Sequence, residues 1–424
     1  MKKVYLSALA LLGSAASLFA QDAQMRKAPD QSPVQQATPG RACATMEVFE
    51  SQLAADPARA QRMEAIEAQT RRYLAQPTML QRSTTDGTTT ITIPVVVHVV
   101  YNTAAQNVPQ AQVEDQIRVL NEDFAKMNSD VNNVPSLYAG VASATNVRFV
   151  LATRNPSGGV TNGVVRVQTK TRSFSSNDFV KYTNKGGSNA WPRDKYLNIW
   201  LCNLGQGLLG YAQFPGGAAA TDGVVCLYSS VPGGTASNYN LGRTATHEVG
   251  HWLNLRHIWG DATCGNDFVA DTPTQQTSNG GCPTFPKITC NNQGDMSMNY
   301  MDYTYDQCMY MFTAGQSSRM DALFAVGGAR ELLKSSDGAK AQRQMAVVPM
   351  SLYPNPASDV LNLEIKGKAR SNYAISVYDL RGQQMTQARY DGDGHVQVAS
   401  LPKGLYYIRI ANGTEVTHQR FEKE

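Results

Sequence analysis

Three of the chain's six histidines lie close together in the sequence, at His247, His251 and His257. Residues four apart share one face of a helix, so the imidazoles of His247 and His251 can bind the same ion. Glu248 follows the first histidine, and its carboxylate can reach a water molecule bound to that ion. The H-E-x-x-H spacing therefore predicts a zinc site with Glu248 as general base.

His257 can bind the same ion only if the chain turns sharply after His251. The extended motif H-E-x-x-H-x-x-G-x-x-H has glycine at this turn, whereas this chain has Asn254. The turn requires a positive φ, and asparagine is among the few residues besides glycine that adopt it. We therefore predict that all three histidines bind zinc, against the alternative of a chance match on a polar helix.

The composition indicates an exported globular protein. The 424 residues are enough for two or three domains, with 42% hydrophobic residues, 17% charged residues and a net charge of +4. This weak charge, without a basic cluster, does not indicate nucleic acid or a membrane surface as the main partner. Residues 1–20 combine a basic start, a short apolar run and small residues, which predicts a bacterial signal peptide. This apolar run is too short for a transmembrane helix, and no later stretch reaches the length of one.

Cysteine positions support export. Four of the seven cysteines lie in the polar segment from Cys264 to Cys308, where an oxidising compartment allows disulfides. Four cysteines permit three pairings, and their spacing does not choose among them. Cys202 and Cys226 lie in apolar runs and are expected to be buried thiols. Cys43 lies far upstream in a polar region.

The pattern of apolar residues predicts the elements that position the histidines. Helical spacing occurs at 46–74 and 109–127, and Thr313 with Gln316 forms a capping box for a helix to about Leu333. Because proline cannot donate a ladder hydrogen bond, the central part of the first strand should begin after Pro94. The predicted strands are 88–101, 147–152, 164–167, 197–202, 207–214 and 223–228. Together they predict a mixed sheet, with 207–214 as an edge strand along which an extended polypeptide can lie.

The character of the chain changes after about residue 345. Apolar and polar residues alternate at 361–365, 375–377 and 406–410, and glycine-containing turns separate these runs. This pattern predicts a small antiparallel β domain.

Residues 85–330 resemble the pappalysin family of metzincin metallopeptidases, in its short bacterial branch of the ulilysin and mirolysin type. The resemblance rests on the segments 210–215, 247–260, 271–273 and 299–303 taken together. It implies an α+β fold, with a metzincin, zincin-like catalytic domain that combines a mixed twisted sheet with an active-site helix. The small β-sandwich domain would follow it.

The resemblance also implies roles for single residues. His247, His251 and His257 would bind zinc and leave a position open for water, and Glu248 would pass a proton from that water to the leaving amine. Met301 would form a hydrophobic floor beneath the zinc, the Met-turn, which is compatible with ordinary core packing.

Two further residues have roles implied by the resemblance. Tyr303 would donate a hydrogen bond to the tetrahedral intermediate or bind zinc at rest, and a packed core tyrosine is the alternative. Asp306 would lie at the base of the pocket that receives the side chain just after the scissile bond. A buried carboxylate there would select arginine, then lysine, and a solvated loop aspartate is the alternative.

The loop after the zinc motif would be held by disulfides and calcium. The resemblance implies two disulfides, Cys264 with Cys290 and Cys282 with Cys308. It places calcium in the loop that contains Asp267, Asp271 and Thr272, where oxygen-rich side chains suit this ion. Aspartates that only form turns are the alternative.

Cys43 lies in the sequence R-A-C-A-T. In the family, a cysteine in a similar R-x-C-G-T context blocks the zinc as a thiolate, although here Ala44 replaces the glycine. The chain's own pro-segment would then be its inhibitor, removed by self-cleavage with Gln81–Arg82 as a candidate bond. A stray or intermolecular thiol is the alternative.

The last domain resembles the type IX secretion sorting domain of Bacteroidetes, on segments 353–356, 377–382, 401–406 and 420–424. Its partner would be the type IX secretion machinery, which would carry the protein through the periplasm to the outside of a Gram-negative cell. A carbohydrate-binding or adhesive β module is the alternative.

We therefore predict a secreted zinc endopeptidase made as a zymogen, which cleaves polypeptides before arginine or, less readily, lysine. Its parts would be a signal peptide (1–20), a pro-segment (21–81), a catalytic domain (82–345) and a sorting domain (346–424). The alternatives are a non-catalytic surface binding protein on the same scaffold and a different hydrolase with the same zinc chemistry.

Overall fold

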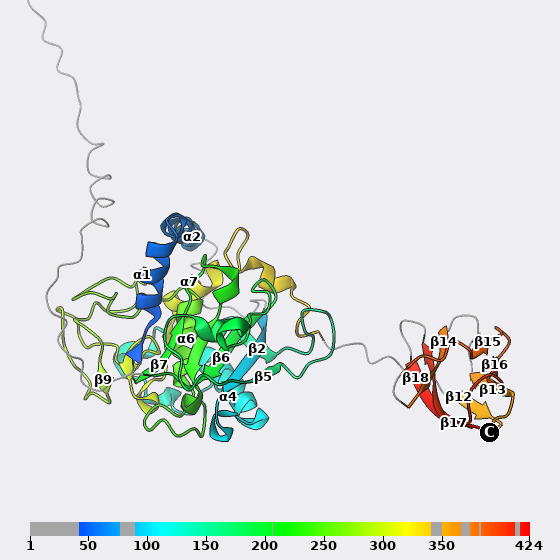
Figure 1. Cartoon of the computed structure of the whole chain (residues 1–424). Helices are drawn as coiled ribbons and strands as arrows, with labels where there is room; N and C mark the ends of the chain where they lie inside the picture. Colours follow the sequence, from blue (N-terminus) through cyan, green and yellow to red (C-terminus); the bar gives the residue numbers. More distant parts are fainter. Residues whose placement is uncertain are drawn as a thin grey trace, which may run out of the picture. The chain divides into compact units, whose positions relative to one another are not determined.

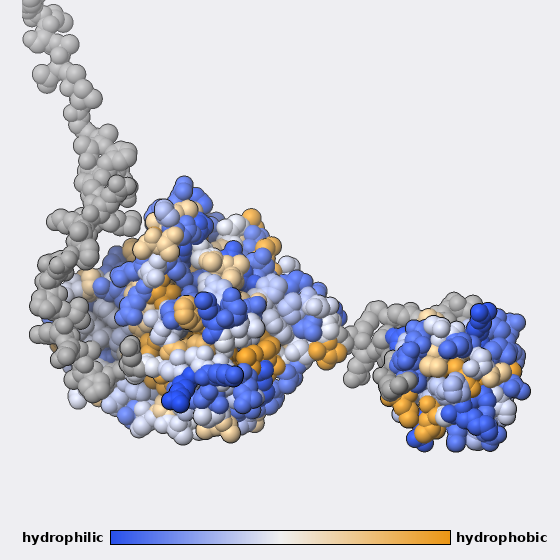
Figure 2. Space-filling model, viewed as in Figure 1, coloured by the Kyte–Doolittle hydropathy of each residue, from blue (hydrophilic) through white to orange (hydrophobic). Residues whose placement is uncertain are grey.

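The computed structural model describes residues 42–76, 90–205, 207–340, 350–365, 374–380, 383–411 and 416–424. The predicted signal peptide, the start of the predicted pro-segment and the Gln81–Arg82 bond lie outside these residues. Among the helices described, none is both long and apolar enough to cross a membrane. Figure 2 shows hydrophilic residues over most of the visible surface, with apolar residues in small scattered groups.

A mixed sheet with strand order β1-β7-β8-β6-β2-β4, in which β5 also pairs with β2, forms the centre of the larger part of the chain (Figure 1). Only the pairing of β7 with β8 is antiparallel in this sheet. The strands are β1 (Ala42–Cys43), β2 (Ile91–Tyr101), β4 (Val147–Leu151), β5 (Val164–Gln168), β6 (Leu197–Cys202), β7 (Leu208–Ala212) and β8 (Val224–Leu227). The sheet is therefore mixed, as predicted.

The β2 strand follows the sequence pattern closely. Its run of valines is buried, which suits a strand covered on both faces. Pro94 pairs with β4, and the pairing of β2 with β6 begins one residue later, at Val95. The part of β2 that is paired on both sides thus begins after the proline, as predicted. Cys202 and Cys226 are buried in β6 and β8, also as predicted.

Helices α4 (Gln110–Phe124) and α6 (Arg243–Trp252) pack against each other and against the sheet (Figure 1). Helix α7 (Ala314–Ala322) begins at the predicted capping box of Thr313 and Gln316. The prediction that it runs to Leu333 is wrong. A Cβ at Gly328 would lie 2.3 Å from the carbonyl oxygen of Leu323, so the chain folds back there, and a separate 3₁₀ turn follows at Glu331–Ser335.

The predicted helix 46–74 is two helices, α1 (Thr45–Ala55) and α2 (Ala58–Leu74). Asp56 is extended because it precedes Pro57, and this ends the first helix. Neither helix has a core of its own. Phe49 and Met63 share a cluster with Phe214 of the catalytic part, and α2 packs on α7.

The polar segment between α6 and α7 contains little regular structure. Two disulfides close it, Cys264–Cys290 and Cys282–Cys308, which is the pairing that the resemblance implied. The remaining short strands and α-helix described in the catalytic part are β3 (Ala142–Ser143), α5 (Ser136–Ala139), β9 (Gly280–Gly281), β10 (Tyr303–Thr304) and β11 (Phe312–Thr313).

The C-terminal part is a small antiparallel β-sandwich, as predicted. One sheet has the order β12-β13-β16-β15 and the other β14-β17-β18. Leu361, Leu363, Val377, Ile408 and Phe421 belong to the core between them. The strands are β12 (Met350–Tyr353), β13 (Val360–Ile365), β14 (Ala374–Asp379), β15 (Arg389–Tyr390), β16 (His395–Gln397), β17 (Gly404–Ala411) and β18 (Val416–Lys423).

Candidate active site

The three predicted zinc ligands converge in the structure. His247 and His251 lie one turn apart on α6, and the chain leaves the helix through Asn254, whose φ of 69° is left-handed. This turn brings His257 back to the helix. The Nε2 atom of His251 lies 3.1 Å from the Nε2 atoms of both other histidines, and all three side chains are buried.

Each imidazole is oriented by an oxygen at its other nitrogen. Carbonyl and carboxylate oxygens accept hydrogen bonds, so each Nδ1 carries the proton and each Nε2 presents a lone pair to the centre. The partners are the carbonyl of Tyr300 for His247 (2.7 Å), the carbonyl of Leu255 for His251 (2.8 Å) and Asp261 Oδ1 for His257 (2.5 Å). The donor set therefore fits a zinc ion.

Burial also favours the metal-binding form of the central histidine. Burial first, and then the neighbouring His257, hold the pKa of His251 well below its ordinary value. A neutral imidazole is the form that binds a metal ion.

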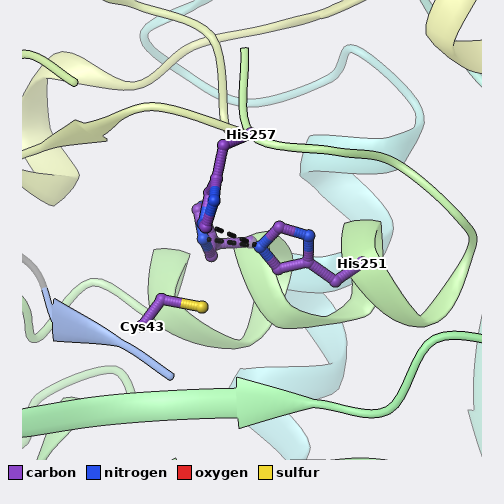
Figure 3. Close-up of side chains that lie close together, drawn as sticks. Cys43, His251 and His257 are labelled. Atoms are coloured by element: carbon purple, nitrogen blue, oxygen red, sulfur yellow. Dashed lines mark hydrogen bonds between the residues drawn. The ribbon is translucent and has the colours of Figure 1, made fainter. Parts of the chain in front are cut away.

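Cys43 contributes a fourth donor. Its strand β1 runs parallel to β7, and its sulfur points toward the histidine rings (Figure 3). Its Sγ and a ring nitrogen of each histidine lie within 4.8 Å of one another. Burial and the charge of Glu248 raise the pKa of this thiol, whereas a bound divalent cation would favour the thiolate. One sulfur and three nitrogens are a donor set that suits zinc.

The carboxylate of Glu248 is also engaged by the segment around Cys43. Cys43 Sγ lies 3.4 Å from Glu248 Oε2, and the hydroxyl of Thr45 donates to the same oxygen at 3.0 Å. The hydroxyl of Thr45 in turn accepts from the backbone N–H of Ala212, at the end of β7. Sequence reasoning missed Thr45, although it lies two residues after the cysteine in the R-A-C-A-T segment.

Two residues of the segment after the histidines, Met301 and Tyr303, lie beside the site. Met301 is fully buried, and a Cβ at Gly250 of α6 would lie 2.4 Å from its sulfur, so helix and methionine are in close contact. The ring centre of Tyr303 lies 5.0 Å from that of His257, and its hydroxyl donates to the carbonyl of Cys43 at 3.3 Å. Tyr303 therefore faces the histidine cluster.

Asp306 is fully buried, so it is not a solvated loop residue. Its Oδ2 accepts from the backbone N–H groups of Leu241 (2.9 Å) and Arg243 (3.2 Å). These bonds hold the chain where it enters α6. The carboxylate thus has a structural use that the sequence did not indicate.

The three residues suggested for calcium do not all meet. The hydroxyl of Thr272 lies 2.9 Å from both carboxylate oxygens of Asp267 and 2.9 Å from the carbonyl oxygen of Val269. Burial raises the pKa of Asp267 to about 6. Asp271 instead accepts from the hydroxyl of Thr313 and the backbone N–H of Gly315, at the start of α7.

Comparisons with known proteins agree with this geometry. The family described as "Pregnancy-associated plasma protein-A" matches residues 181–325, and the family described as "Secretion system C-terminal sorting domain" matches residues 351–424. Extracellular metalloprotease 1 of Coccidioides posadasii is 35% identical over 238 residues, which cover 54% of this chain and 74% of that protein. An extracellular metalloprotease of Arthroderma otae is 34% identical over 247 residues, 56% of this chain and 79% of that protein.

Solved structures of similar fold include precursor and mature forms. A mutant of Tannerella forsythia promirolysin is 48% identical, with a TM-score of 0.63, and the match covers 70% of this chain and 97% of that one. Mature mirolysin of the same organism, solved in complex with a cleaved peptide, is 54% identical, with a TM-score of 0.57, and the match covers 58% of this chain and 97% of that one.

Proposed function

The chain belongs to the pappalysin family of metallopeptidases, with a type IX secretion sorting domain at its C-terminal end, and we propose that His247, His251 and His257 bind its catalytic zinc. It is a secreted metallopeptidase made as a precursor. The observation that carries the assignment is the convergence of three Nε2 atoms, each oriented from behind by an oxygen.

Glu248 would be the general base. Bound zinc would supply a Lewis acid that polarises the scissile carbonyl and lowers the pKa of water. The Glu248 carboxylate would take the proton of the attacking water and deliver it to the leaving amine. Tyr303, whose hydroxyl lies at the same site, would donate a hydrogen bond to the oxygen that becomes negative. Met301 would support the histidine helix from beneath.

The pro-segment would keep the precursor inactive in three ways. Cys43 would close the zinc site as a thiolate, while the hydroxyl of Thr45 donates to Oε2 of the general base. Strand β1 pairs with β7, so it also covers the edge along which a polypeptide substrate would lie. Self-cleavage at Gln81–Arg82 would separate residues 21–81 from the catalytic domain, and their departure would relieve all of these contacts.

Asp306 would select arginine, and less strongly lysine, just after the scissile bond. Its burial supports this proposal, because a buried carboxylate strongly favours a cationic partner. Asp306→Asn keeps an oxygen that can accept from the start of α6 but removes the charge. The ratio of cleavage before arginine to cleavage before glutamine should fall toward one, and an unchanged ratio would remove Asp306 from the specificity pocket.

Calcium would bind the loop that contains Asp267, Asp271 and Thr272. The oxygens around the Thr272 hydroxyl support this, although the Asp271 carboxylate is used at the start of α7. Titration calorimetry of the zinc-loaded protein with calcium tests this site. We expect Asp267→Asn to abolish the heat of calcium binding, and an unchanged heat in the variant would place calcium elsewhere.

The decisive experiment compares the full-length protein with its Glu248→Ala variant. Each is incubated with a peptide library, with and without a zinc chelator, and the fragments are identified by mass spectrometry. Chelator-sensitive cleavage before arginine by the wild type alone supports the zinc mechanism and the specificity. No cleavage by wild type that has lost residues 21–81 and contains zinc would favour the non-catalytic surface binding protein.

The sorting domain, residues 346–424, would direct the protein to the type IX machinery and then be removed. Whether the mature enzyme is released or stays on the cell surface can be read from fractionation of the producing cells. A chain without residues 346–424 should accumulate in the periplasm, and its appearance outside the cell would refute this role.

A further inference from the structure

A buried carboxylate of α2 contacts the turn between the zinc-binding residues. Glu67 Oε1 accepts a hydrogen bond from the Asn254 side-chain amide at 3.1 Å and forms an ion pair with the Arg319 guanidinium. Arg319 Nε donates to the Asn254 carbonyl at 2.9 Å, which closes the cluster. The exposed fractions of these three residues are 8% or less.

These three residues join three different elements. Glu67 comes from α2, Asn254 from the turn between α6 and His257, and Arg319 from α7. The cluster therefore attaches the pro-segment to the catalytic part without using the zinc ligand Cys43.

Other groups of α2 reinforce this attachment. Arg59 is 1% exposed and donates to the carbonyls of Phe214 (3.0 Å) and Pro215 (2.7 Å), in the loop after β7. The Gln69 side chain donates to the carbonyl of Ala322 at the end of α7. Helix α2 thus bridges the loop after β7 and the end of α7.

We propose that α2 is a second inhibitory element, anchored by Glu67 independently of the metal. The proposal rests on the proposed zymogen function and deepens it. Because the Cys43 contact and the Glu67 anchor lie on one chain, each holds the other close to its site. Cleavage between α2 and β2 would therefore leave the pro-segment bound, and activation would require loss of α2 itself.

Asn254, which replaces the glycine of the zinc motif, contributes a hydrogen bond to this arrangement. Glycine at position 254 could adopt the same φ but could not donate a side-chain hydrogen bond to Glu67. Asn254 therefore links the backbone turn that delivers His257 to the helix that blocks the enzyme. Removal of Glu67 would leave Arg319 buried without its carboxylate, which is costly for the bound state.

Hydrogen exchange of the α2 amides tests the anchor without using activity. The protein is the full chain with Glu248→Ala, which prevents self-cleavage, with zinc and after zinc removal. A 17-residue helix detached from its support is only marginally stable, so its amides would exchange quickly. We expect α2 to stay protected after zinc removal, and Glu67→Gln to lower this protection about 100-fold.

The matched control is Glu64→Gln on the same helix, because Glu64 is exposed and pairs with Arg71 of α2 itself. Its α2 protection should not change. If Glu67→Gln also exposes the amides of β2, the test moves to Asn254→Gly, which removes one donor to Glu67 and suits the turn. About a 10-fold loss of α2 protection is then expected.

Two results would overturn the proposal. One is loss of α2 protection on zinc removal while Glu67 is intact, because the metal would then be the sole anchor. The other is unchanged protection in Glu67→Gln and Asn254→Gly. An inactive mature enzyme would refute the proposed function, yet it would leave these exchange results to decide on the anchor.

Discussion

The carboxylate of Glu248 has room beside β7 because residue 210 has no side chain. A Cβ at Gly210 would lie 2.8 Å from Glu248 Oε1 and 2.8 Å from the Val225 carbonyl oxygen. Gly210→Ala should therefore displace Glu248, the proposed general base. Since displacement of a reacting group by about 1 Å can cost ~100-fold in rate, we expect kcat of the mature enzyme to fall by about that factor, with zinc content unchanged.

The control for this substitution is Gly140→Ala, where a Cβ would meet no atom within 4 Å. Steady-state kinetics and metal analysis of both variants make the comparison. A normal kcat in Gly140→Ala and in Gly210→Ala alike would show that the position of Glu248 tolerates an added methyl group.

Asp261 was not found from the sequence, although it lies four residues after His257. Its Oδ1 accepts from His257 Nδ1 at 2.5 Å. Outer partners of this kind make an imidazole a better ligand, and their loss typically weakens metal binding 10–100-fold. Asp261 has a positive φ of 56°, which asparagine tolerates, so the suitable variant is Asp261→Asn.

We expect zinc affinity in Asp261→Asn to fall about 10-fold, measured by competition with a chelator of known affinity. Asp115→Asn, on the exposed side of α4, serves as control. Equal affinities in the two variants would mean that the Asp261 charge does not support His257.

Local spacing was sufficient to predict that the three histidines converge, and contacts between distant parts of the chain were not predictable from it. The positions four apart on a helix and an asparagine at the turn identify His247, His251 and His257. Thr45 and Glu67 contact the site from about 200 residues away in sequence. One sequence carries no signal for such pairs, because the distance between them depends on the whole fold.

At the scale of elements, strand β2 contains a buried titratable group, His98. Its ring nitrogens lie 2.8 Å from Ser188 Oγ and 3.1 Å from Asn198 Oδ1, and its ring stacks on Trp200. Burial lowers its pKa to about 4, against the opposing effect of the Asn198 hydrogen bond. The folded protein therefore keeps His98 neutral at pH values where the unfolded chain is protonated.

This shift makes the free energy of unfolding depend on pH. Between about pH 6.5 and pH 4 the unfolded state binds more protons, so stability is lost as the pH falls and His98 contributes about 3 kcal/mol to that loss. His98→Gln keeps an amide for hydrogen bonding but does not titrate. Urea unfolding at pH 7 and pH 4.5 should show a smaller pH effect in the variant, and an equal effect would assign the acid sensitivity to other groups.

The ends of helices and strands were predicted well where the buried face of a segment gives a regular apolar pattern. They were predicted poorly where a contact with another part of the chain ends the element. The apolar spacing of α4 and the buried run of β6 gave both elements nearly at their observed ends. The end of α7 was missed, because Gly328 must approach the Leu323 carbonyl, a contact without a periodic signal. Helix 46–74 was divided by Pro57, which was a visible signal.

At the scale of the whole molecule, the catalytic part and the C-terminal sandwich have separate hydrophobic cores. The core that contains Leu361 and Phe421 draws its described members from residues 350–421, and the main core draws its members from residues 66–333. Two such cores should unfold independently.

Differential scanning calorimetry of the Glu248→Ala precursor should therefore show two transitions. Zinc binds the folded catalytic part and not the sandwich, so chelation should lower the first midpoint and leave the second unchanged. A dissociation constant 1,000-fold below the free zinc concentration corresponds to about 4 kcal/mol of stabilisation, which is several degrees in midpoint. A chain that ends at residue 345 should lose only the zinc-independent transition and should keep the zinc-dependent one. If chelation shifted both transitions, the two cores would be energetically coupled and the sorting domain would be part of the folded enzyme.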